Sequence, residues 1–486
     1  MNKIVVSLTT YNKRIHSINK VIESLNKQSV KPDVIVLYLY SKEFESIDLN
    51  INKQDNLVVK FVDENLKGHK KYFYAFQEYK DDIVITLDDD VYYHKDTIKK
   101  LLEFHKKYPK CVVANRTRFI TMRDCEIEDY YRWEKNFPEN YPSMLLIGTG
   151  VLGILYPPHT FNEQIFDKEN LIKYALDNDD MWLKIHQIRN GVKTVLTDLD
   201  KSLNLIEDTQ ETALCQENYV NDGCNKAINE LTNLYSIDLK KIFLSEFKND
   251  NFQVIYKGLY STCFKNNEFV IKTLNFENSP ESEYEISYTT HNANVSKRRV
   301  FGFSKSPSII VYDYLDGEIL NKTNLNISHF NSICEYIKKL QQISTKKFKP
   351  WNKYRDDCIQ VLSNYIPNSN KEIEMLKTSK CECVIHGDIN PNNVLCNNNE
   401  VFIIDYENSS IGPSWWDKNY LLANYNPNEI DAEILNSLTK EDIENILLIT
   451  KVRIGRLIRK NMDTQKMLNS LRGWESVYIT KEKGDD

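Results

Sequence analysis

Short apolar runs alternate with helical periodicity along the first part of the chain. The runs KIVVSL, DVIVLYLY, NLVVKFV and DIVITL are rich in β-branched residues, which favours buried strands. Between them, INKVIESLNKQ and KKYFYAFQEY place apolar residues three or four positions apart, a spacing that is typical of helices. Strands that alternate with helices of this length predict a mostly parallel sheet covered by helices on both faces.

Polar residues that could bind a ligand or a metal ion follow two of these strands. LTTYNKR comes after the first strand and TLDDD after the fourth. Ligands of such sheets bind at the carboxyl ends of strands, so both stretches are predicted to belong to a site. Three consecutive Asp repel one another unless a cation joins them, and Asp88 and Asp90 could hold a divalent ion that bridges two phosphates. A solvated acidic turn remains the alternative for this run alone.

The pattern changes near residue 245. FQVIYKGLYSTCFKNNEFVIKTLNF predicts three antiparallel strands, with turns at Gly258 and at Asn266–Asn267, and SIIVYDYLDGEIL predicts another strand. After Ile327 helical periodicity dominates. A small sheet followed by a helical part is a second architecture. We therefore predict two domains, residues 1–235 and 251–478, which are joined by a connector at residues 236–250.

A loop in the second domain combines residues that suit phosphoryl transfer. Asp388 and Asn393 lie five positions apart around Pro391, and Asp405 follows the apolar strand VFIID. Phosphoryl transfer requires a base for the attacking hydroxyl and ligands for the Mg²⁺ ions that accompany the triphosphate. Lys272, on a predicted third strand, is the cation expected to meet the phosphates.

Residues from about 250 to 475 resemble the aminoglycoside phosphotransferase and choline kinase superfamily, which has a bilobal protein-kinase-like fold. The motifs IIVYDYLDGEIL, HGDINPNNVL and IIDYENSSIGPSWWD carry the resemblance, in the expected order. The resemblance implies ATP as phosphate donor, Asp388 as catalytic base, and Asn393 and Asp405 as Mg²⁺ ligands. It also implies that Lys272 contacts the α- and β-phosphates.

Further residues follow from the same resemblance. The segment from Tyr312 to Tyr314 is expected to form the hinge that contacts adenine. Glu285 is the predicted ion-pair partner of Lys272, and Glu283 is the alternative. The phosphate loop YKGLYSTCF departs from the family pattern because it has a single glycine. An inactive kinase fold that only binds nucleotide is the alternative hypothesis.

Three other residues of the second domain have structural interpretations. His386 is interpreted as a residue that braces the loop. Trp415 and Trp416 are interpreted as packing residues, with an aromatic cage for a quaternary ammonium group as the alternative.

The first domain resembles GT-A glycosyltransferases, specifically small bacterial enzymes of cell-surface polysaccharide clusters. The resemblance covers about residues 1–230 through VSLTTYNKRI, DENLKGHKKYFYA, TLDDDVYY, GTGVLGILYPP and NDDMWL. It implies a Rossmann-like mixed α/β sheet, a nucleotide-sugar donor, and Mn²⁺ or Mg²⁺ held by Asp88 and Asp90. Asp180 is the predicted base, with Asp179 as the alternative. The residues expected to contact the nucleotide are Thr9, Thr10, Tyr11, Arg14, Asp63 and Lys70.

Together these interpretations predict a bifunctional enzyme. One half would transfer a sugar to a saccharide or lipid-linked glycan, and the other would phosphorylate a hydroxyl group, in the synthesis of a bacterial capsule or lipopolysaccharide. A cytidylyltransferase fused to a choline-type kinase is the alternative, although SLTTYNKRI lacks the glycine-rich loop of such enzymes. A scaffold in which one half has lost catalysis is a further alternative.

Charge and composition narrow the partners and location. The net charge of −6 argues against nucleic acid as the main partner. The chain starts without a signal-peptide pattern, and its ten Cys are scattered, which predicts a reducing cytoplasm. The segment TKVRIGRLIRKNM mixes basic and apolar residues, so peripheral contact with the inner membrane face is an additional hypothesis.

Overall fold

The protein divides into two compact units, residues 1–253 and 254–486. The computed structural model describes residues 2–45, 49, 51–52, 54–124, 126–207, 222–248, 252–257, 261–274, 280–320, 322, 324–397 and 400–484. The predicted turn at Gly258 lies outside these ranges.

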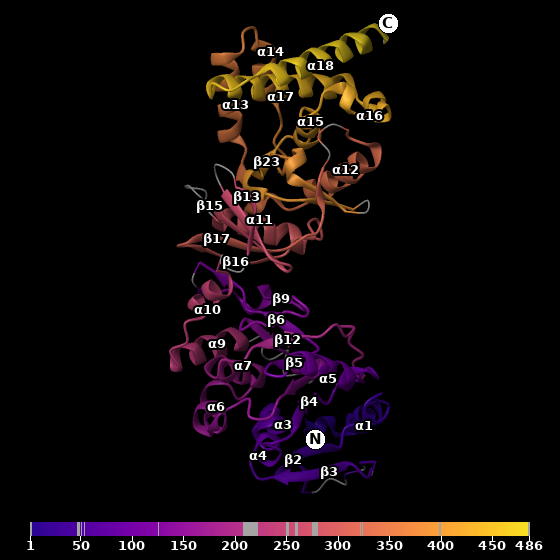
Figure 1. Ribbon diagram of the computed structural model, residues 1–486, viewed down its shortest axis with the longest axis vertical. Helices are drawn as coiled ribbons and strands as arrows, with labels where there is room; N and C mark the ends of the chain where they lie inside the picture. The colour runs from indigo at the N-terminus through magenta and orange to yellow at the C-terminus, as the bar shows by residue number, and fades with distance from the viewer. Residues whose placement is uncertain are drawn as a thin grey trace. The chain divides into compact units, whose positions relative to one another are not determined.

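Unit 1 is built on a seven-stranded sheet with the order β12-β5-β11-β4-β1-β2-β3 (Figure 1). Its pairs are parallel except those of β11, which runs antiparallel to β4 and β5. The sheet is therefore mixed, as the resemblance implies. Its strands are β1 (Ile4–Thr9), β2 (Val34–Tyr40), β3 (Leu57–Val62), β4 (Ile83–Thr86), β5 (Val112–Ala114), β11 (Ile154–Tyr156) and β12 (Thr194–Leu196).

Helices cover both faces of this sheet because successive strand residues point to opposite faces. In β1, Val6 packs with residues of α1 and α5 in one core, whereas Val5 packs with Ala75 of α4 in another. The helices are α1 (Ile18–Asn26), α2 (Ser41–Phe44), α3 (Lys70–Phe73), α4 (Ala75–Glu78), α5 (Thr97–Lys107), α6 (Lys168–Tyr174), α7 (Asp179–Arg189), α9 (Gly223–Leu234) and α10 (Leu239–Glu246). The predicted helix KKYFYAFQEY is thus two short helices, α3 and α4.

Short strands complete unit 1. A three-stranded sheet has the order β10-β6-β9, and β7 and β8 form a hairpin. Their bounds are β6 (Thr117–Phe119), β7 (Met122–Arg123), β8 (Glu126–Ile127), β9 (Glu134–Lys135) and β10 (Leu146–Gly148). Helix α10 falls within the stretch predicted as a connector, and it lies in unit 1.

Unit 2 begins with antiparallel strands that lie side by side in the order β13-β14-β15-β17-β16, with α11 packed on them. The predicted turn between the second and third strands is present, because Asn266 N donates to Phe269 O at 3.0 Å. These elements are β13 (Gln253–Lys257), β14 (Ser261–Lys265), β15 (Phe269–Leu274), α11 (Pro280–Asn292), β16 (Val300–Lys305) and β17 (Ser308–Asp313).

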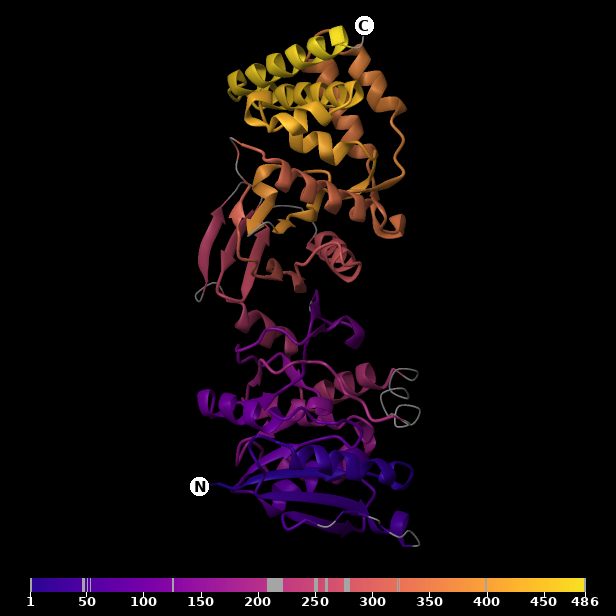
Figure 2. The same cartoon turned by 90° about the vertical axis from the view of Figure 1, so that its right-hand side faces the viewer.

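The rest of unit 2 is mostly helical, and its helices pack together in Figure 2, where they run from orange to yellow. Two small sheets, β18-β21-β22 and β19-β23-β20, lie among them. The helices are α12 (Ile327–Gln341), α13 (Asn352–Tyr365), α14 (Asn370–Thr378), α15 (Trp416–Leu422), α16 (Ala432–Ser437), α17 (Lys440–Arg459) and α18 (Gln465–Gly484). The strands are β18 (Glu318–Ile319), β19 (Lys349–Pro350), β20 (Cys383–Ile385), β21 (Val394–Asn397), β22 (Glu400–Ile403) and β23 (Ser410–Gly412).

The basic segment TKVRIGRLIRKNM comprises the end of α17 and the three residues that follow it. Its residues Val452 and Ile454 are buried in unit 2, whereas Ile458 is exposed. Val452 and Ile454 therefore serve packing, whereas Ile458 and Met462 face solvent. Among the helices in the described ranges, none is both long and apolar enough to span a membrane.

Candidate active sites

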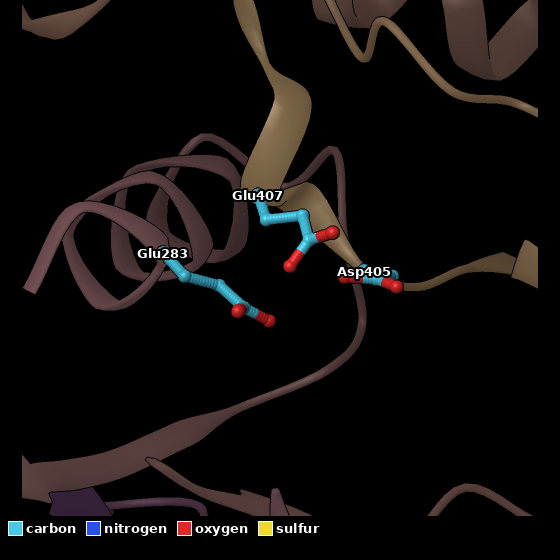
Figure 3. A group of neighbouring side chains, drawn as sticks. All are labelled: Glu283, Asp405 and Glu407. Carbon is cyan, nitrogen blue, oxygen red and sulfur yellow. The ribbon is translucent and has the colours of Figure 1, made fainter. Parts of the chain in front are cut away.

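In unit 2, the ammonium group of Lys272 lies among three carboxylates. Strand β15 brings this side chain to within 2.8 Å of Glu283 Oε2, 2.7 Å of Asp405 Oδ1 and 3.5 Å of Glu407 Oε2. Figure 3 shows the three carboxylates converging from α11 and from the segment after β22. Burial lowers the pKa of Lys272, but the surrounding carboxylates outweigh it and hold that pKa well above its ordinary value. Lys272 is therefore a fixed positive charge.

The partner of Lys272 on α11 is Glu283, and the prediction of Glu285 is wrong. Glu283 is 2% exposed, whereas Glu285 is directed elsewhere, with its carboxylate 3.9 Å from Lys347 Nζ. Residues two positions apart on a helix point to nearly opposite sides, so only one of the two can face β15. The rotation of α11 against the sheet makes this choice, and the local sequence does not specify it.

Asp388 lies on the loop between β20 and β21, and hydrogen bonds to Asp417 fix the backbone of this loop. Asp417, at the start of α15, accepts the backbone N–H groups of His386 at 2.7 Å and Gly387 at 2.9 Å. Gly387 has a φ of +85°, and a Cβ at this position would lie 2.5 Å from Asn408 O. His386 is fully buried and its Nε2 lies 3.1 Å from Ile404 O, which fits a bracing role.

The Asp388 carboxylate is oriented by two amide groups. Asn390 Nδ2 donates to Oδ1 at 3.0 Å, and Asn393 Nδ2 donates to Oδ2 at 3.1 Å. Burial raises the pKa of Asp388, while hydrogen bonds from Asn390 and Tyr420 oppose that rise. A positioned carboxylate with a raised pKa has the properties of a general base.

Residues beside Asp388 have the chemistry to hold a magnesium ion. Carboxylate oxygens of Glu283, Asp405 and Glu407 all lie within 4.8 Å of one another. The Asn393 amide nitrogen is turned toward Asp388, so its carbonyl oxygen is the atom that can ligate a cation. Burial and Asp405 raise the pKa of Glu407 to about 7. Lys272 Nζ already lies among these three carboxylates, and together with the Asn393 carbonyl they offer the oxygen ligands that Mg²⁺ prefers.

The predicted hinge residues have their side chains in other interactions. The Tyr312 hydroxyl donates to Glu283 Oε1 at 2.7 Å, so this ring supports the ion pair and does not face a nucleotide. The Tyr314 hydroxyl accepts from Lys265 Nζ at 2.8 Å. An adenine contact through the backbone of this segment stays a prediction.

In unit 1, a buried lysine joins two of the predicted acidic groups. Lys71 Nζ on α3 lies 2.7 Å from Asp88 Oδ1 and 2.8 Å from Asp179 Oδ2. Burial opposes the charge, but Asp179 and Asp88 hold the pKa of Lys71 well above its ordinary value. The end of β4 and the start of α7 are thereby fixed to one another through a single ammonium group.

The two candidate bases of unit 1 differ in environment. Burial acts against ionisation of Asp179, but Lys71 and His69 hold the pKa of that carboxyl below its ordinary value. Burial and Asp179 raise the pKa of Asp180 well above its ordinary value. Asp180 Oδ2 accepts the backbone N–H of Gly150 at 3.4 Å, which places the GTGVLG turn against this site.

The other acidic residues after β4 interact with the first loop. Arg14 Nη1 lies 2.9 Å from Asp89 Oδ1 and 3.2 Å from Asp90 Oδ2, and Thr10 Oγ1 donates to Asp89 at 2.5 Å. Burial, Asp88 and Asp89 raise the pKa of Asp90 to about 6. Asp90 Oδ1 is buried and has no hydrogen-bond partner in the described part of the chain, which fits a role as cation ligand.

The remaining nucleotide candidates of unit 1 are spread around this loop. Thr9 Oγ1 donates to Tyr38 O at 2.9 Å, so its hydroxyl already hydrogen-bonds the neighbouring strand. The Tyr11 ring lies 5.8 Å from the Arg14 guanidinium carbon. Lys70 is buried, and burial lowers its pKa. Asp63 is exposed after β3, where Ser41 Oγ donates to it at 3.4 Å.

Four residues of the two sites were missed from sequence. Lys71 and Asp89 adjoin predicted residues, and their pairing depends on how α3 and the first loop fold onto the end of β4. Glu407 and Asp417 are acidic residues of the IIDYENSSIGPSWWD motif, which could have indicated them.

Comparison with known proteins identifies the class of each unit. Residues 5–144 match the family model described as glycosyl transferase family 2, and residues 308–445 match the phosphotransferase enzyme family. Both families consist of transferases, and the two matches confirm the resemblances stated for the two halves of the chain. The fold class is likewise confirmed, a GT-A-like mixed sheet followed by a kinase-like unit.

Solved structures with similarity to the chain are distant. A choline/ethanolamine kinase family protein from Mesorhizobium loti is 14% identical, with a TM-score of 0.36, over 46% of this chain and 87% of the other. Choline kinase from Streptococcus pneumoniae is 14% identical, with a TM-score of 0.37, over 49% and 99%. Choline kinase from Cryptosporidium parvum is 15% identical, with a TM-score of 0.36, over 49% and 91%. No curated protein matches the chain.

Proposed function

We propose that the chain is a bifunctional enzyme, a metal-dependent glycosyltransferase in unit 1 and an ATP-dependent kinase of an alcohol in unit 2. The observation that carries the proposal is that each unit gathers its own carboxylates around a buried lysine. Lys71 joins Asp88 to Asp179 in unit 1, and Lys272 joins Glu283 to Asp405 in unit 2. The two family matches agree with this division.

In the phosphotransferase reaction, Asp388 would accept the proton of the substrate hydroxyl as its oxygen attacks the γ-phosphorus of ATP. Lys272, held by Glu283, would contact the α- and β-phosphates. Asp405 and Asn393 would hold Mg²⁺, which neutralises charge on the phosphates when bound. Asn390 and Asn393 keep the base in the orientation that this transfer requires.

In the glycosyltransferase reaction, Asp88 and Asp90 would hold Mn²⁺ or Mg²⁺ at the diphosphate of a nucleotide sugar. The metal supplies Lewis-acid assistance to the departing nucleoside diphosphate when bound. Asp180 would serve as base toward the acceptor hydroxyl, because Asp179 is paired with Lys71. The nucleotide would lie near Tyr11 and Lys70.

We further propose that the two halves act on one cytoplasmic product, a phosphorylated glycan of a bacterial capsule or lipopolysaccharide. The acceptor of unit 1 would be a saccharide or a lipid-linked glycan. A lipid-linked acceptor would bring the protein to the inner face of the membrane. The support for this coupling is the presence of both units in one chain.

The kinase half is tested by magnesium-dependent release of ADP from ATP with pooled alcohol acceptors. We expect Asp388→Asn to lower this rate by about 10²–10⁴-fold, because a general base typically contributes that much. Asp356→Asn removes the same charge from an exposed position of α13 and should leave the rate unchanged. Equal rates in the wild type and Asp388→Asn would contradict the assignment of the base.

The glycosyltransferase half is tested with manganese or magnesium by release of UDP or GDP from UDP- or GDP-sugars, and of CMP from CMP-sugars. We expect Asp90→Asn to lower the rate at least ~10-fold, since it weakens a metal ligand. Asp81→Asn, on the exposed surface of the same unit, is the matched control. A rate that is insensitive to both chelator and Asp90→Asn would contradict the metal site.

A further inference from the structure

Aromatic rings lie beneath the loop that carries Asp388. The Trp416 indole donates to Gly387 O at 3.2 Å, and its ring centroid lies 5.4 Å from that of Tyr354 and 5.8 Å from that of Tyr420. Both tyrosines are partly exposed, and the negative charge of Asp388 raises the pKa of each, after the larger effect of burial. The Tyr420 hydroxyl also hydrogen-bonds to Asp388, so these rings lie beside the carboxylate that is the candidate base.

Both tyrosine rings already carry a cation. The Arg456 guanidinium carbon lies 4.6 Å from the ring centroid of Tyr354, and that of Arg453 lies 5.7 Å from the centroid of Tyr420. Arg456 also donates to the Tyr354 hydroxyl at 2.8 Å. We call Tyr354, Tyr420, Arg453 and Arg456 the acceptor-side group. A quaternary ammonium requires an open aromatic face, and here it would lie beside two guanidinium groups.

The charges of this group are not fully balanced. Arg456 and Arg459 share one carboxylate, Asp357, at 2.8 and 2.7 Å. Arg453 donates to the backbone carbonyl of Ala423 at 2.9 Å, which fixes its position without neutralising it. The charge of Arg453 lowers the pKa of Asp388, but none of the ion pairs of the described residues includes Arg453, and its side chain is partly exposed. A guanidinium held in this way has further N–H donors for an anion.

We propose that the acceptor of the unit 2 kinase is an alcohol that carries a phosphate or carboxylate group, and that Arg453 binds this anion. The proposal rests on the phosphotransferase function proposed for unit 2. In the reaction, the acceptor hydroxyl gives its proton to Asp388 and its oxygen bonds to the γ-phosphorus. The bond from that phosphorus to the bridging oxygen breaks, and ADP leaves with the electron pair. Arg453 would determine which alcohol binds, through its contact with the anion.

An anionic acceptor also fits the guanidinium groups that lie over the two tyrosine rings. An anion satisfies the guanidinium groups that a cationic alcohol would meet with repulsion. The aromatic cage that the paired tryptophans suggest is not available at Trp416, which is fully buried and donates to the catalytic loop.

The test measures binding of four alcohols to the full chain with magnesium and a non-hydrolysable ATP analogue. The alcohols are glucose 6-phosphate, glucuronate, glucose and choline, and calorimetry gives each Kd. We expect the phosphate or the carboxylate compound to bind at least ~10-fold more tightly than glucose and choline, which also identifies the anion. Turnover of the same alcohols with ATP then gives kcat and KM.

Variants assign the preference to Arg453. Arg453→Gln should weaken binding of the anionic alcohol about 10–100-fold, through KM more than kcat, and should leave glucose binding unchanged. Arg453→Lys keeps the charge and should lose less. Arg472→Gln, on an exposed position of α18, should behave as the wild type. Melting temperatures of all variants exclude loss of folding as the cause.

Three results would overturn the proposal. They are tighter binding of choline or glucose than of both anions, no binding of either anion, and anion binding that Arg453→Gln leaves unchanged. Failure of the proposed kinase function has a different signature, because the wild type would then release no ADP from ATP with any alcohol, whether or not the ATP analogue binds. The turnover measurement therefore separates the two failures.

Discussion

At the level of single residues, Lys272 and Lys71 have the same kind of environment in two different folds. Each is a buried ammonium whose charge is retained because two or more carboxylates lie within ion-pair distance. A buried charge is tolerated only with such partners, and removal of one partner leaves the others uncompensated. The partners of these lysines are therefore the most sensitive positions of the two sites.

The pair Glu283 and Glu285 offers a direct test of this account. We expect Glu283→Gln to lower the phosphotransferase kcat/KM at least ~10-fold and to lower the melting temperature, because a buried ion pair is broken. Glu285→Gln removes the same charge two positions along α11, at a partly exposed site, and should change kcat/KM less than about twofold. Equal losses in the two variants would contradict the assignment of the Lys272 partner.

Lys184 shows the opposite case, a buried lysine without a close partner. Its side chain is fully buried, its Nζ has no hydrogen-bond partner in the described part of the chain, and burial lowers its pKa to about 7. The unfolded chain protonates this group below about pH 10.4, and the folded chain only below about pH 7. Unit 1 therefore loses stability as the pH falls from about 10 to 7, by about 1.4 kcal/mol per pH unit at most.

Replacing this lysine should remove that dependence. We expect Lys184→Met to raise the melting temperature of the unit 1 transition at pH 7 and to raise it much less at pH 9.5. Thermal denaturation of the full chain at the two pH values measures the difference. Lys226→Met, on the exposed face of α9, is the control and should change neither value by much. An equal gain at both pH values would show that Lys184 is charged in the folded state at pH 9.5.

At the level of elements, both sites depend on loops that helices hold at the ends of strands. Asp417 at the start of α15 binds two backbone N–H groups of the loop that carries Asp388, and Gly387 allows that loop to pass close to Asn408. In unit 1, Asp179 and Asp180 open α7, and Gly150 brings a turn against them. The geometry of each site is thus set by contacts between elements.

Gly387→Ala tests how closely the loop that carries Asp388 packs against Asn408. A Cβ at this position combines a left-handed backbone with a clash against a carbonyl oxygen, so we expect a loss of about 2–4 kcal/mol and of most phosphotransferase activity. Gly191→Ala has a similar backbone, with φ at +67°, but nothing within 4 Å of the added Cβ. It should cost about 1 kcal/mol and leave this activity unchanged. Thermal denaturation and ADP release measure both effects.

The elements themselves could be predicted from sequence more fully than the contacts between them. The apolar runs that end near Thr9 and Asp88 are strands of the sheet, as predicted. Each run could be recognised because its apolar residues are consecutive in the sequence. The choice of Glu283 over Glu285 depends on the rotation of α11, and the role of Lys71 depends on where α3 packs. These are relations between segments distant in sequence, so periodicity carries no information about them.

At the level of the whole molecule, each unit has its own buried cores and its own candidate site. The cores of unit 1 lie on the two faces of its sheet, and those of unit 2 lie beneath its strands and among its helices. The paired side chains of each site belong to a single unit. We therefore expect a substitution at one site to leave ligand binding at the other unchanged.

The most direct measurement is thermal stabilisation of the full chain by ATP, CTP and UDP-, GDP- and CMP-sugars, each with magnesium or manganese. A ligand at about 100 times its Kd adds about 2.7 kcal/mol, which gives a clear shift. We predict that Asp405→Asn removes only the shift caused by ATP and that Asp90→Asn removes only the shift caused by a nucleotide sugar. Loss of both shifts in one variant would contradict two independent sites, and stabilisation of unit 1 by CTP without any nucleotide sugar would contradict the glycosyltransferase assignment.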